Sequence, residues 1–546
     1  MDTDVLVAGA GPIGLTAAIE LRRRGISCRV IDPLLEPPRY AKAVGIQPRT
    51  LEVFENMGVL KAVLDASIMM RGQIVYTNGE HVGRIDLALP ADVPYGFAML
   101  PQYETERILA ERLAELGSGV ERGVGIVSVD QDTEGVTVTT SDSAIDHVQY
   151  VIGCDGSHSV VRKQLGLSFE GDAFAEAYML GDVEVDWSQP TGYGIRITRT
   201  ATDGTTDAML VAMPLPGHKR YRMTMLVPPE LTDRPSSGDG ITHGFAAGPA
   251  PKLHHIQAVL DQLAPEPTTA SNLRWSSVFR ISHRIVDAYG WGRVFVAGDA
   301  AHIHPPTGAQ GMNTGIQDAH NLAWKVALSV RGVAAPGLTD SYDVERRPVG
   351  EEVVGMTVRN AREGIGAGQS SVETAMRKQA QLLISYAGSP LVSESDPTAA
   401  VVQPGERAPD ARGLIRDMVA FPLRLFELFG GVGHTLLLYS DGEVGKFEEL
   451  GAAAVDAAHG LLDVYLLVAS YVTSVLPVVV DSASEFRTEY GVTGPTAFVI
   501  RPDGYLGHRG LEGVIENLKK DIRAMSCPTW GGLHPDETHP SERMHS

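Results

Sequence analysis

The sequence predicts an α/β protein in which a parallel-sheet domain is interrupted by a β-rich domain and followed by a smaller α/β module. Residues 4–32 have the pattern strand, glycine turn, helix and strand, a βαβ unit that requires a parallel sheet. Residues 176–282 instead alternate short strands with proline and glycine turns. The α/β pattern returns with "RVFVAGDA" at residues 293–300 and again beyond residue 400.

Length and charge limit the classes of protein that the chain can belong to. With 546 residues, it is expected to form about two to four domains. The net charge of -21 argues against general affinity for nucleic acid or an anionic membrane. The 3 cysteines are too widely spaced for a disulfide framework or a metal-binding pair. We therefore predict a cytoplasmic protein without a signal peptide or membrane span, either monomeric or homodimeric.

The motif "GAGPIG" places Gly9, Gly11 and Gly14 between the first strand and the first helix. Glycines at this spacing permit a tight turn and a close approach of the backbone to a pyrophosphate. The helix N-terminus adds free N–H groups and a partial positive charge. Asp32 ends the next strand about 20 residues on, where a carboxylate accepts hydrogen bonds from a ribose. These features predict a Rossmann-like dinucleotide site.

Two further segments contain candidate contacts to an anionic cofactor. The segment "PRYAKAVGIQPRT" contains Lys42 and Arg49. Either both are solvated surface charges, or one of them faces the cofactor phosphates. In "CDGSHSVVRKQLG", Asp155 and Gly156 lie in a compact turn that enters a helix. Asp155 alone could equally be a helix N-cap.

The segment "GDAAHIHPPTGAQGMNTGIQDA", residues 298–319, allows three interpretations. As a metal site it has His302 and His304 but no further ligand cluster, and as a hydrolase turn it lacks the GxSxG pattern. As a cofactor cradle it ends a strand with Asp299, and "GAQGMN" offers backbone N–H groups before a helix. The shortage of bulky side chains would let a flat ring lie against the backbone. We favour the cradle, expect structural roles for the histidines, and predict no metal.

The three motifs, in this order and followed by "YDVERRPV", resemble those of the FAD-dependent aromatic hydroxylases, class A flavoprotein monooxygenases of the p-hydroxybenzoate and phenol hydroxylase type. The resemblance covers roughly residues 1–375. The C-terminal part, with "LLLYSDG" and "RPDGYLGHR", resembles the thioredoxin-like domain found in one branch of this family. It lacks a CxxC pair, so it is not expected to be redox-active.

The domain boundaries follow from this resemblance and from the composition of the C-terminal part. The FAD-binding domain would comprise residues 1–70, 99–175 and 283–375, and the substrate-binding β-sheet domain residues 71–98 and 176–282. We expect a linker at 376–400, the thioredoxin-like domain at 401–525 and a disordered tail at 526–546.

The resemblance also implies which residues contact non-covalently bound FAD. At the pyrophosphate and ribose these are Gly9, Gly11, Gly14, Lys42 and Asp32; at the flavin and its ribityl chain they are Gln102, Asp299, Gly311, Met312 and Asn313. Asp155 and Gly156 belong to a motif that serves both FAD and NADPH binding. Lys42 stands where these hydroxylases usually have an arginine. His158 is a candidate NAD(P)H contact, and the loop with Pro306 and Gly308 would line the reacting face. No residue is expected to act as acid or base.

The implied activity is NAD(P)H-dependent hydroxylation of a phenolic or other small aromatic substrate through a flavin C4a-hydroperoxide formed with O₂. The β-rich domain would cover the substrate. Its candidate substrate contacts, some of which could instead be structural residues of the strands, are Tyr193, Arg196, Arg220, Tyr221 and Arg222. One alternative is a Baeyer–Villiger monooxygenase acting on a polyketide ketone. A more distant one is an FAD-fold binding scaffold without catalysis, against which the presence of all three motifs argues.

Overall fold

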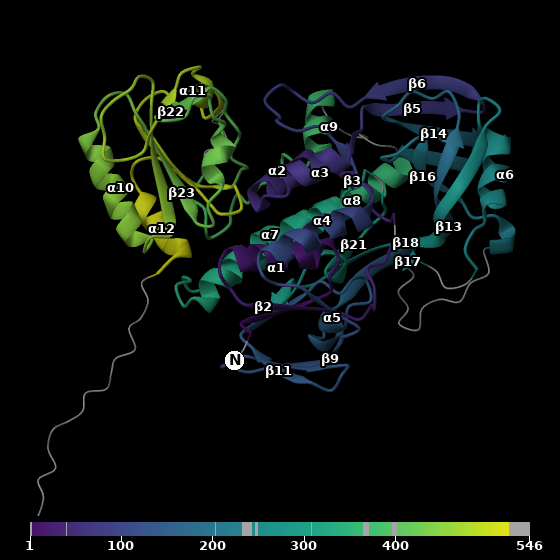
Figure 1. Ribbon diagram of the computed structural model, residues 1–546, viewed down its shortest axis with the longest axis horizontal. Coiled ribbons are helices and arrows are strands. Elements are labelled where there is room, and N and C mark those ends of the chain that lie inside the picture. Colours follow the sequence, from purple (N-terminus) through teal and green to yellow (C-terminus); the bar gives the residue numbers. More distant parts are fainter. Residues whose placement is uncertain are drawn as a thin grey trace, which may run out of the picture.

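The computed structural model describes residues 3–39, 41–202, 204–231, 243–245, 249–306, 308–363, 371–395 and 401–523. A large antiparallel sheet and the sheet of the C-terminal domain lie on opposite sides of a central group of helices (Figure 1). The parallel sheet lies below these helices in the same view. The expected tail at 526–546 falls outside the described residues.

The parallel sheet has the strand order β19-β20-β12-β1-β2-β8, and every pair except β19–β20 is parallel. Its strands are β1 (Val5–Ala8), β2 (Cys28–Asp32), β8 (Val120–Arg122), β12 (Tyr150–Gly153), β19 (Gly290–Trp291) and β20 (Val294–Val296). The central strand β1 is buried along its whole length, as its continuous apolar sequence requires.

Helices from three separate stretches of chain pack around this sheet. They are α1 (Pro12–Arg23), α2 (Pro48–Met57), α3 (Leu60–Ala66), α4 (Gln102–Glu115), α5 (Val160–Gln164), α7 (Gly311–Val330) and α8 (Ser341–Glu363). Helix α7 is buried on all sides from Met312 to Leu328, as expected for a helix in the centre of a large protein. It packs against α1, α2 and α8, so its N-terminus is held in a fixed position beside the glycine turn that precedes α1.

The second sheet is the large one, with the order β17-β18-β13-β16-β15-β14-β5-β6 and β21 paired to β18. It is antiparallel except for the parallel pair of β14 and β5, and we call it the large antiparallel sheet. Its strands are β5 (Gly72–Thr77), β6 (Glu80–Asp86), β13 (Phe169–Asp186), β14 (Tyr193–Thr200), β15 (Thr206–Pro214), β16 (Arg220–Leu226), β17 (Gly244–Phe245), β18 (Thr269–Val286) and β21 (His302–Ile303). Helix α6 (Leu253–Leu263) packs on one face of the sheet. Strand β13 begins at Phe169, before the expected range 176–282, and β18 ends at Val286, after it, because residues 169–173 pair with residues 282–286 and connect the two domains.

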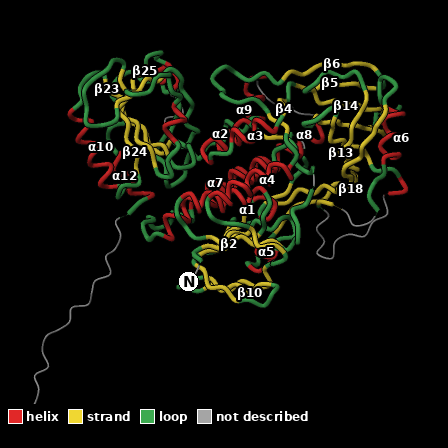
Figure 2. Tube along the Cα trace, viewed as in Figure 1, coloured by secondary structure: helices red, strands yellow, loops and turns green. Residues whose placement is uncertain are grey.

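Two small sheets complete this part of the chain (Figure 2). One is the antiparallel meander of β9 (Ile126–Gln131), β10 (Val136–Thr140) and β11 (Ile145–Val148). The other joins β3 (Gly45–Ile46), β4 (Ile68–Met69) and β7 (Ala98–Met99), and it brings residues 43–47 beside the N-terminus of α7. Short 3₁₀ helices occur at Pro229–Leu231, Gly298–Ala300 and Leu425–Phe429.

The C-terminal sheet has the order β22-β25-β24-β23-β26-β27 with parallel and antiparallel pairs. Its strands are β22 (Leu414–Arg416), β23 (His434–Ser440), β24 (Leu462–Val468), β25 (Val478–Asp481), β26 (Thr496–Ile500) and β27 (Leu506–Arg509), and its helices are α10 (Gly445–Ala457), α11 (Glu485–Glu489) and α12 (Val514–Asp521). The core on one side of this sheet includes Trp324 and Leu328 of α7, so the domain shares a hydrophobic core with the rest of the protein.

The described part of the expected linker 376–400 is not a linker, and this prediction was wrong. Residues 372–379 form helix α9 (Val372–Gln379), and Ala380 and Leu382 are buried in a cluster with Met70 and Phe97. Leu391 is buried in the core of the C-terminal domain. The polar, proline-containing composition concealed these apolar residues, which are too few to give a periodic pattern.

A buried ion cluster joins the C-terminal domain to α7 and α8. Glu345 of α8 accepts hydrogen bonds from Lys325 Nζ at 2.7 Å and from both terminal nitrogens of Arg501 at 2.6 and 2.8 Å. Arg501 also pairs with Asp503, and all of these charged side chains are at most 2% exposed. Each charge has an opposite partner, as buried charges require.

Substitution Arg501→Met is expected to destabilise the docked C-terminal domain, because it leaves the carboxylates of Glu345 and Asp503 with too few cations. Breaking a buried pair costs about 3–5 kcal/mol of unfolding free energy. Chemical denaturation, together with hydrogen exchange of α7, measures the loss. Arg412→Met, which breaks an exposed pair with Glu485 in the same domain, is the control and should cost at most about 1 kcal/mol. Equal effects of the two substitutions would contradict the role of the cluster.

Candidate functional site

A single large cavity extends from the glycine turn before α1 to the large antiparallel sheet. Its volume is about 1530 Å³, and its lining includes Gly11, Ile13, Asp299, Met312 and strand residues of the sheet. Pockets that hold one drug-sized ligand measure roughly 300–1,000 Å³. The cavity is therefore large enough for two molecules side by side.

The glycine turn has no room for side chains. Gly9 adopts φ +97°, and a Cβ atom on it would lie 2.3 Å from the carbonyl oxygen of Cys154. A Cβ atom on Gly14 would lie 1.9 Å from the carbonyl oxygen of Gly9. In contrast, a Cβ atom on Gly11 would meet nothing within 4 Å, because this residue faces the cavity. Gly9 and Gly14 thus close the turn, and Gly11 leaves it open to a ligand.

Two helix N-termini face the cavity with uncapped N–H groups. Helix α1 has no side-chain cap, and the N–H groups of Gly11 and Ile13 have no acceptor among the described residues. The N–H groups of Gly311, Met312 and Asn313, at the start of α7, likewise have no acceptor within the described part of the chain. A helix N-terminus of this kind binds anions and carbonyl oxygens.

Asp32 lies beneath the glycine turn and does not line the cavity. Its carboxylate accepts the N–H groups of Ala10 and Leu34 at 2.8 and 2.9 Å, and it pairs with Arg122 at 3.3 Å. These bonds attach the turn to the end of β2. Contact between Asp32 and a ribose stays a prediction.

Lys42 and Asp299, expected to contact different parts of the cofactor, form an ion pair with each other across the cavity lining. Lys42 Nζ lies 2.8 Å from Asp299 Oδ2. Burial opposes ionisation of Asp299, but the Lys42 ammonium and the nearby His243 outweigh it and hold the pKa of this carboxyl well below its usual range. Asp299 is therefore charged at neutral pH and can accept hydrogen bonds from a ligand.

In the "CDG" motif, Cys154 and Gly156 line the cavity, whereas Asp155 has a structural role. The N-cap of α5 is Ser159, whose hydroxyl oxygen accepts the N–H of Arg162 at 2.9 Å, and not Asp155. Asp155 supports this helix start, because its carboxylate accepts hydrogen bonds from the Ser159 hydroxyl and from the N–H of Val160. Arg162 of the same turn donates to the carbonyl oxygens of Ala300 and Ser157 and so holds this turn against the Gly298–Ala300 turn.

Other residues expected at the site lie partly on the cavity and partly away from it. Gly156 lines the cavity, whereas Asp155 and His158 do not, and His158 is exposed. Gln102 lines the cavity at the start of α4, where it accepts the N–H of Ala43 and donates to Glu106. Burial raises the pKa of Glu106 to about 7.

A buried network connects the segment 298–319 to α8. Asp318 of α7 accepts from the N–H of Gly298, from His302 Nε2 at 2.8 Å and from Arg346 Nε at 2.8 Å. Burial opposes ionisation, but Arg346 and His302 together keep the pKa of Asp318 below its ordinary value. Arg346 belongs to "YDVERRPV", so this motif supports the cradle from behind.

His304 differs from His302 because it lines the cavity. Its Nδ1 faces the carbonyl oxygen of Pro305 at 3.0 Å, and its buried Nε2 has no partner among the described residues. Burial and the neighbouring His302 lower the pKa of His304 to about 4, so the ring is neutral at pH 7.

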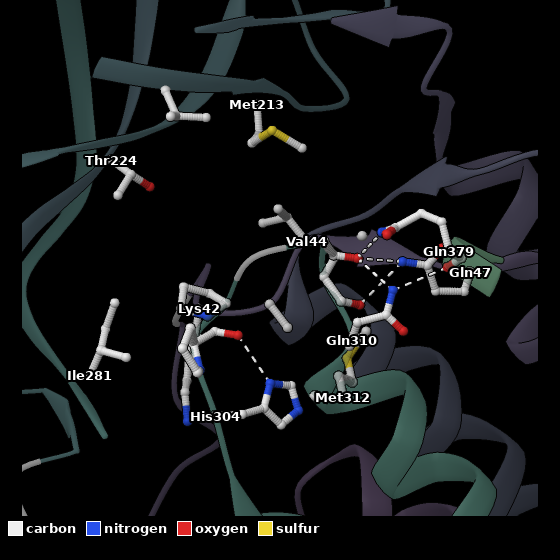
Figure 3. Close-up of a pocket in the computed structure, with 18 of the residues that line it drawn as sticks. Lys42, Val44, Gln47, Met213, Thr224, Ile281, His304, Gln310, Met312 and Gln379 are labelled. Atoms are coloured by element: carbon white, nitrogen blue, oxygen red, sulfur yellow. Dashed lines mark hydrogen bonds between the residues drawn. The ribbon is translucent and has the colours of Figure 1, made fainter. Parts of the chain in front are cut away.

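Three glutamines fix the loop that contains Pro306 and Gly308 (Figure 3). The Nε2 atoms of Gln47, Gln310 and Gln379 donate to the carbonyl oxygen of Gly308 at 2.7, 3.0 and 2.6 Å. These donors come from the β3 region, the start of α7 and the end of α9. Gln47 and Gln379 could not be predicted as part of the site, since nothing in their local sequence indicates that they share one acceptor.

The sheet forms the opposite wall of the cavity, with side chains that alternate between its two faces. On β16, Tyr221 and Met223 point into the core covered by α6, and Arg222 and Thr224 line the cavity. The wall is mainly apolar, and the other residues of the sheet that contribute to it include Leu180, Met209, Val211, Met213, Phe279 and Ile281.

This alternation divides the candidate substrate contacts. Tyr221 is buried in the core on the far face, and the Tyr193 hydroxyl donates to Asp86 at 2.8 Å. Arg220 forms an ion pair with Asp182. These three are scaffold. Arg196 and Arg222 line the cavity.

Comparison with known proteins identifies the family. The fold and cavity are those of a dinucleotide-binding protein whose cavity continues from the glycine turn to the large sheet. Residues 2–357 match the family model described as an FAD binding domain. A flavin-dependent monooxygenase of Mycobacteroides abscessus is 32% identical over 95% of this chain and 100% of its own length. The 6-methylpretetramide 4-monooxygenase of Streptomyces rimosus is 32% identical over 98% of this chain and 95% of the relative.

Similarity to solved structures agrees with this result. The structure of an anhydrotetracycline hydroxylase from Streptomyces rimosus has a TM-score of 0.72 at 27% identity, covering 96% of this chain and 100% of that one. The chain belongs to the FAD-binding-domain family of flavin-dependent monooxygenases. It is an FAD-dependent monooxygenase of the aromatic hydroxylase class, with O₂ as co-substrate, and the resemblance drawn from its motifs is confirmed.

The residues present fit FAD. The free N–H groups at α1 and the open side of Gly11 suit a pyrophosphate, and the side-chain-poor start of α7 suits the edge of a flat ring. Among the described residues, no three His, Cys, Asp or Glu side chains gather closely enough to hold a metal ion. In the same part of the chain, no helix has the length and apolar character needed to cross a bilayer.

Substitution Arg346→Leu is expected to lower the unfolding free energy by about 3–5 kcal/mol, because it leaves Asp318 buried without its main cationic partner. The neighbouring Arg347→Leu is the matched control. Arg347 pairs with Glu351 on the surface, where loss of the pair costs about 0–1 kcal/mol. Urea unfolding of both variants gives the comparison, and a loss for Arg346→Leu no larger than the control's would refute the network's role.

Proposed function

We propose that the protein is an NAD(P)H-dependent monooxygenase that hydroxylates a phenolic, polycyclic aromatic substrate held between FAD and the large antiparallel sheet. The observation that carries the proposal is the continuity of the cavity, whose lining runs from the glycine turn to the apolar wall of the sheet. One end suits a dinucleotide, and the other suits a flat apolar molecule. The names of two relatives, 6-methylpretetramide 4-monooxygenase and anhydrotetracycline hydroxylase, support a polycyclic substrate.

FAD would occupy the end of the cavity formed by α1 and α7. The N–H groups of Gly11 and Ile13 would receive the pyrophosphate, Asp299 the ribityl hydroxyl groups and the N–H groups of Met312 and Asn313 the pyrimidine edge. When bound, FAD supplies the redox chemistry: it accepts electrons from NAD(P)H and activates O₂, so that one oxygen atom can be transferred to an aromatic carbon. We assign no protein acid or base to this transfer.

The protein's own contribution would be to position the substrate and exclude water. The apolar wall of the sheet removes water from the reacting region, which protects a reactive oxygen species from hydrolysis. The loop with Gly308, fixed by three glutamine side chains, would hold the reacting face at a constant distance from the substrate.

We further propose that residues 401–523 form a thioredoxin-like domain without redox activity. Its mixed sheet and flanking helices support this assignment, and no cysteine occurs in this range of the sequence. Its contribution would be to the stability of α7, with which it shares a core.

Substitution Asp299→Ala is expected to weaken FAD binding by about ten- to a hundredfold, because hydrogen bonds to a charged acceptor contribute about 1.5–3 kcal/mol. Titration of the flavin-free protein with FAD, followed by flavin fluorescence, measures the change. Asp172→Ala removes a carboxylate from another part of the cavity lining and should leave FAD affinity nearly unchanged. Unchanged affinity in Asp299→Ala would contradict the assigned contact.

Oxidation of NADPH under air is expected to be strongly stimulated by the correct polycyclic phenol, with a product heavier by one oxygen atom. A panel of simple phenols, phenylpropanoids and polycyclic polyketides, followed by mass spectrometry, tests this. A lactone or ester as the only product would favour Baeyer–Villiger oxidation instead. A colourless protein that cannot be reconstituted with FAD would refute the proposal.

A further inference from the structure

Arg222 has an unusual position on the cavity side of β16. Its neighbours along the strand, Tyr221 and Met223, point to the opposite face and are buried under α6. In the sheet, Arg222 is paired with Asp182 of β13 on one side and with Met213 of β15 on the other. The side chain lines the cavity and is 8% exposed. A guanidinium group is therefore buried in a mainly apolar wall.

Arg222 has no hydrogen-bond or ion-pair partner among the residues that the structure describes. The nearest carboxylate in the sheet, Asp182, is fully used by Arg220, whose Nε lies 2.7 Å from Asp182 Oδ1 and whose Nη2 pairs with the second oxygen. The Nε atom of Arg222 is completely buried without an acceptor. Two arginines thus flank one carboxylate, and only Arg220 is neutralised.

The other acidic residues of the cavity lining are too distant or already paired. Along the extended strand β13, Glu176 lies about 20 Å and Asp172 about 33 Å from Asp182, and both are exposed. Asp299 pairs with Lys42. Figure 3 shows Met213 and Thr224, the neighbours of Arg222 in the sheet, across the cavity from Lys42 and His304. Arg222 is therefore on the substrate side and not beside the α1 turn.

A buried guanidinium without a partner is energetically costly. Burial lowers the pKa of Arg222 to about 10, so the group remains positively charged at pH 7. An isolated charge in an apolar environment is stabilised only when an opposite charge reaches it. The five N–H donors of a guanidinium lie in one plane and match two oxygens of a planar anion.

We propose that Arg222 binds a planar anionic pair of oxygens on the substrate, either a carboxylate or the ionised enol of a 1,3-dicarbonyl. This inference rests on the proposed function, because it makes the sheet side of the cavity the substrate compartment. The substrate class is then an aromatic polycycle with one acidic group at the end that faces β16. Arg196, which also faces the cavity from β14, about 10 Å away across β15, contributes charge without the same burial.

The test compares ligands of equal shape and different charge on the FAD-loaded, oxidised protein. Anthracene-2-carboxylate and anthracene-2-carboxamide are titrated by calorimetry into the wild type and the Arg222→Met variant. We expect the wild type to bind the carboxylate about 30-fold more tightly than the amide, and Arg222→Met to lose this preference. Arg222→Lys should retain part of it, because a point charge replaces the planar fork.

A second ligand pair separates the two sources of the anion. The acidic enol 2-acetylindane-1,3-dione is compared with the neutral 2-acetylindan-1-one in the same proteins. Tighter binding of this enol than of the carboxylate identifies a 1,3-dicarbonyl substrate, and tighter binding of the carboxylate identifies a carboxylate substrate. Either result supports the proposal, provided that Arg222→Met abolishes the difference in affinity.

Two controls distinguish a direct contact from a general effect. Arg196→Met removes the same charge from the same face of the sheet and should reduce the preference for the carboxylate much less than Arg222→Met does. FAD affinity should be equal in all variants, and thermal unfolding of the ligand-free Arg222→Met protein should occur at the same temperature as in the wild type or higher, because an unpaired charge is removed.

Several outcomes would overturn the proposal. One is that the wild type binds the charged and neutral ligands with equal affinity, or binds neither measurably. Another is that the preference for the charged ligand persists in Arg222→Met. An equal effect of Arg196→Met would show a long-range charge effect instead of a contact. The proposed function fails separately, through absent FAD binding or absent substrate-stimulated NADPH oxidation, and neither measurement depends on Arg222.

Discussion

The carboxylate of Asp318 holds together the elements on which the cavity depends. It accepts hydrogen bonds from the turn after β20, from β21 through His302 and from α8 through Arg346. All of these partners are buried, so the carboxylate stays ionised only while they surround it. Because Asp318 lies in α7, this one group fixes the N-terminus of α7 relative to the segment that carries Asp299.

Helix α7 connects this arrangement to the C-terminal domain. Its first turn faces the cavity with free N–H groups, and its last turns are part of the C-terminal core through Trp324 and Leu328. Between them, Lys325 enters the ion cluster with Glu345 and Arg501. The C-terminal domain therefore stabilises the same helix whose N-terminus contributes to the candidate flavin site, although its own residues do not line the cavity.

The part of the site that the sequence predicted is the part that local physical chemistry determines. The turn with Gly9 and Gly14 was predictable because their close contacts arise within one strand-turn-helix unit and its neighbouring strand. The free N–H groups before α7 follow from a glycine-rich helix start. The parallel β1–β2 pair follows from the βαβ pattern, since parallel strands need a crossover.

Features that depend on distant pairing could not be predicted from the sequence. Lys42 and Asp299 are 257 positions apart, and only the folded chain brings them into one ion pair. Arg220 and Arg222 look equivalent in the sequence. The register between β13 and β16 places Asp182 opposite Arg222, and only the side-chain contacts of the folded chain show that Arg220 is the arginine that pairs with it. The end of α9 and the residues after it have the composition of a linker, because their few apolar residues, including Ala380 and Leu382, pack against other segments and form no pattern of their own.

A crystal structure with FAD and a polycyclic phenol tests most directly whether the two ligands share the one cavity. We predict the pyrophosphate within hydrogen-bonding distance of the N–H groups of Gly11 and Ile13, the flavin ring beside Met312, and the phenol between that ring and β16. Two results would contradict the account. One is FAD bound outside this cavity, and the other is a flavin ring that fills the space beneath β16 and leaves no room for the phenol.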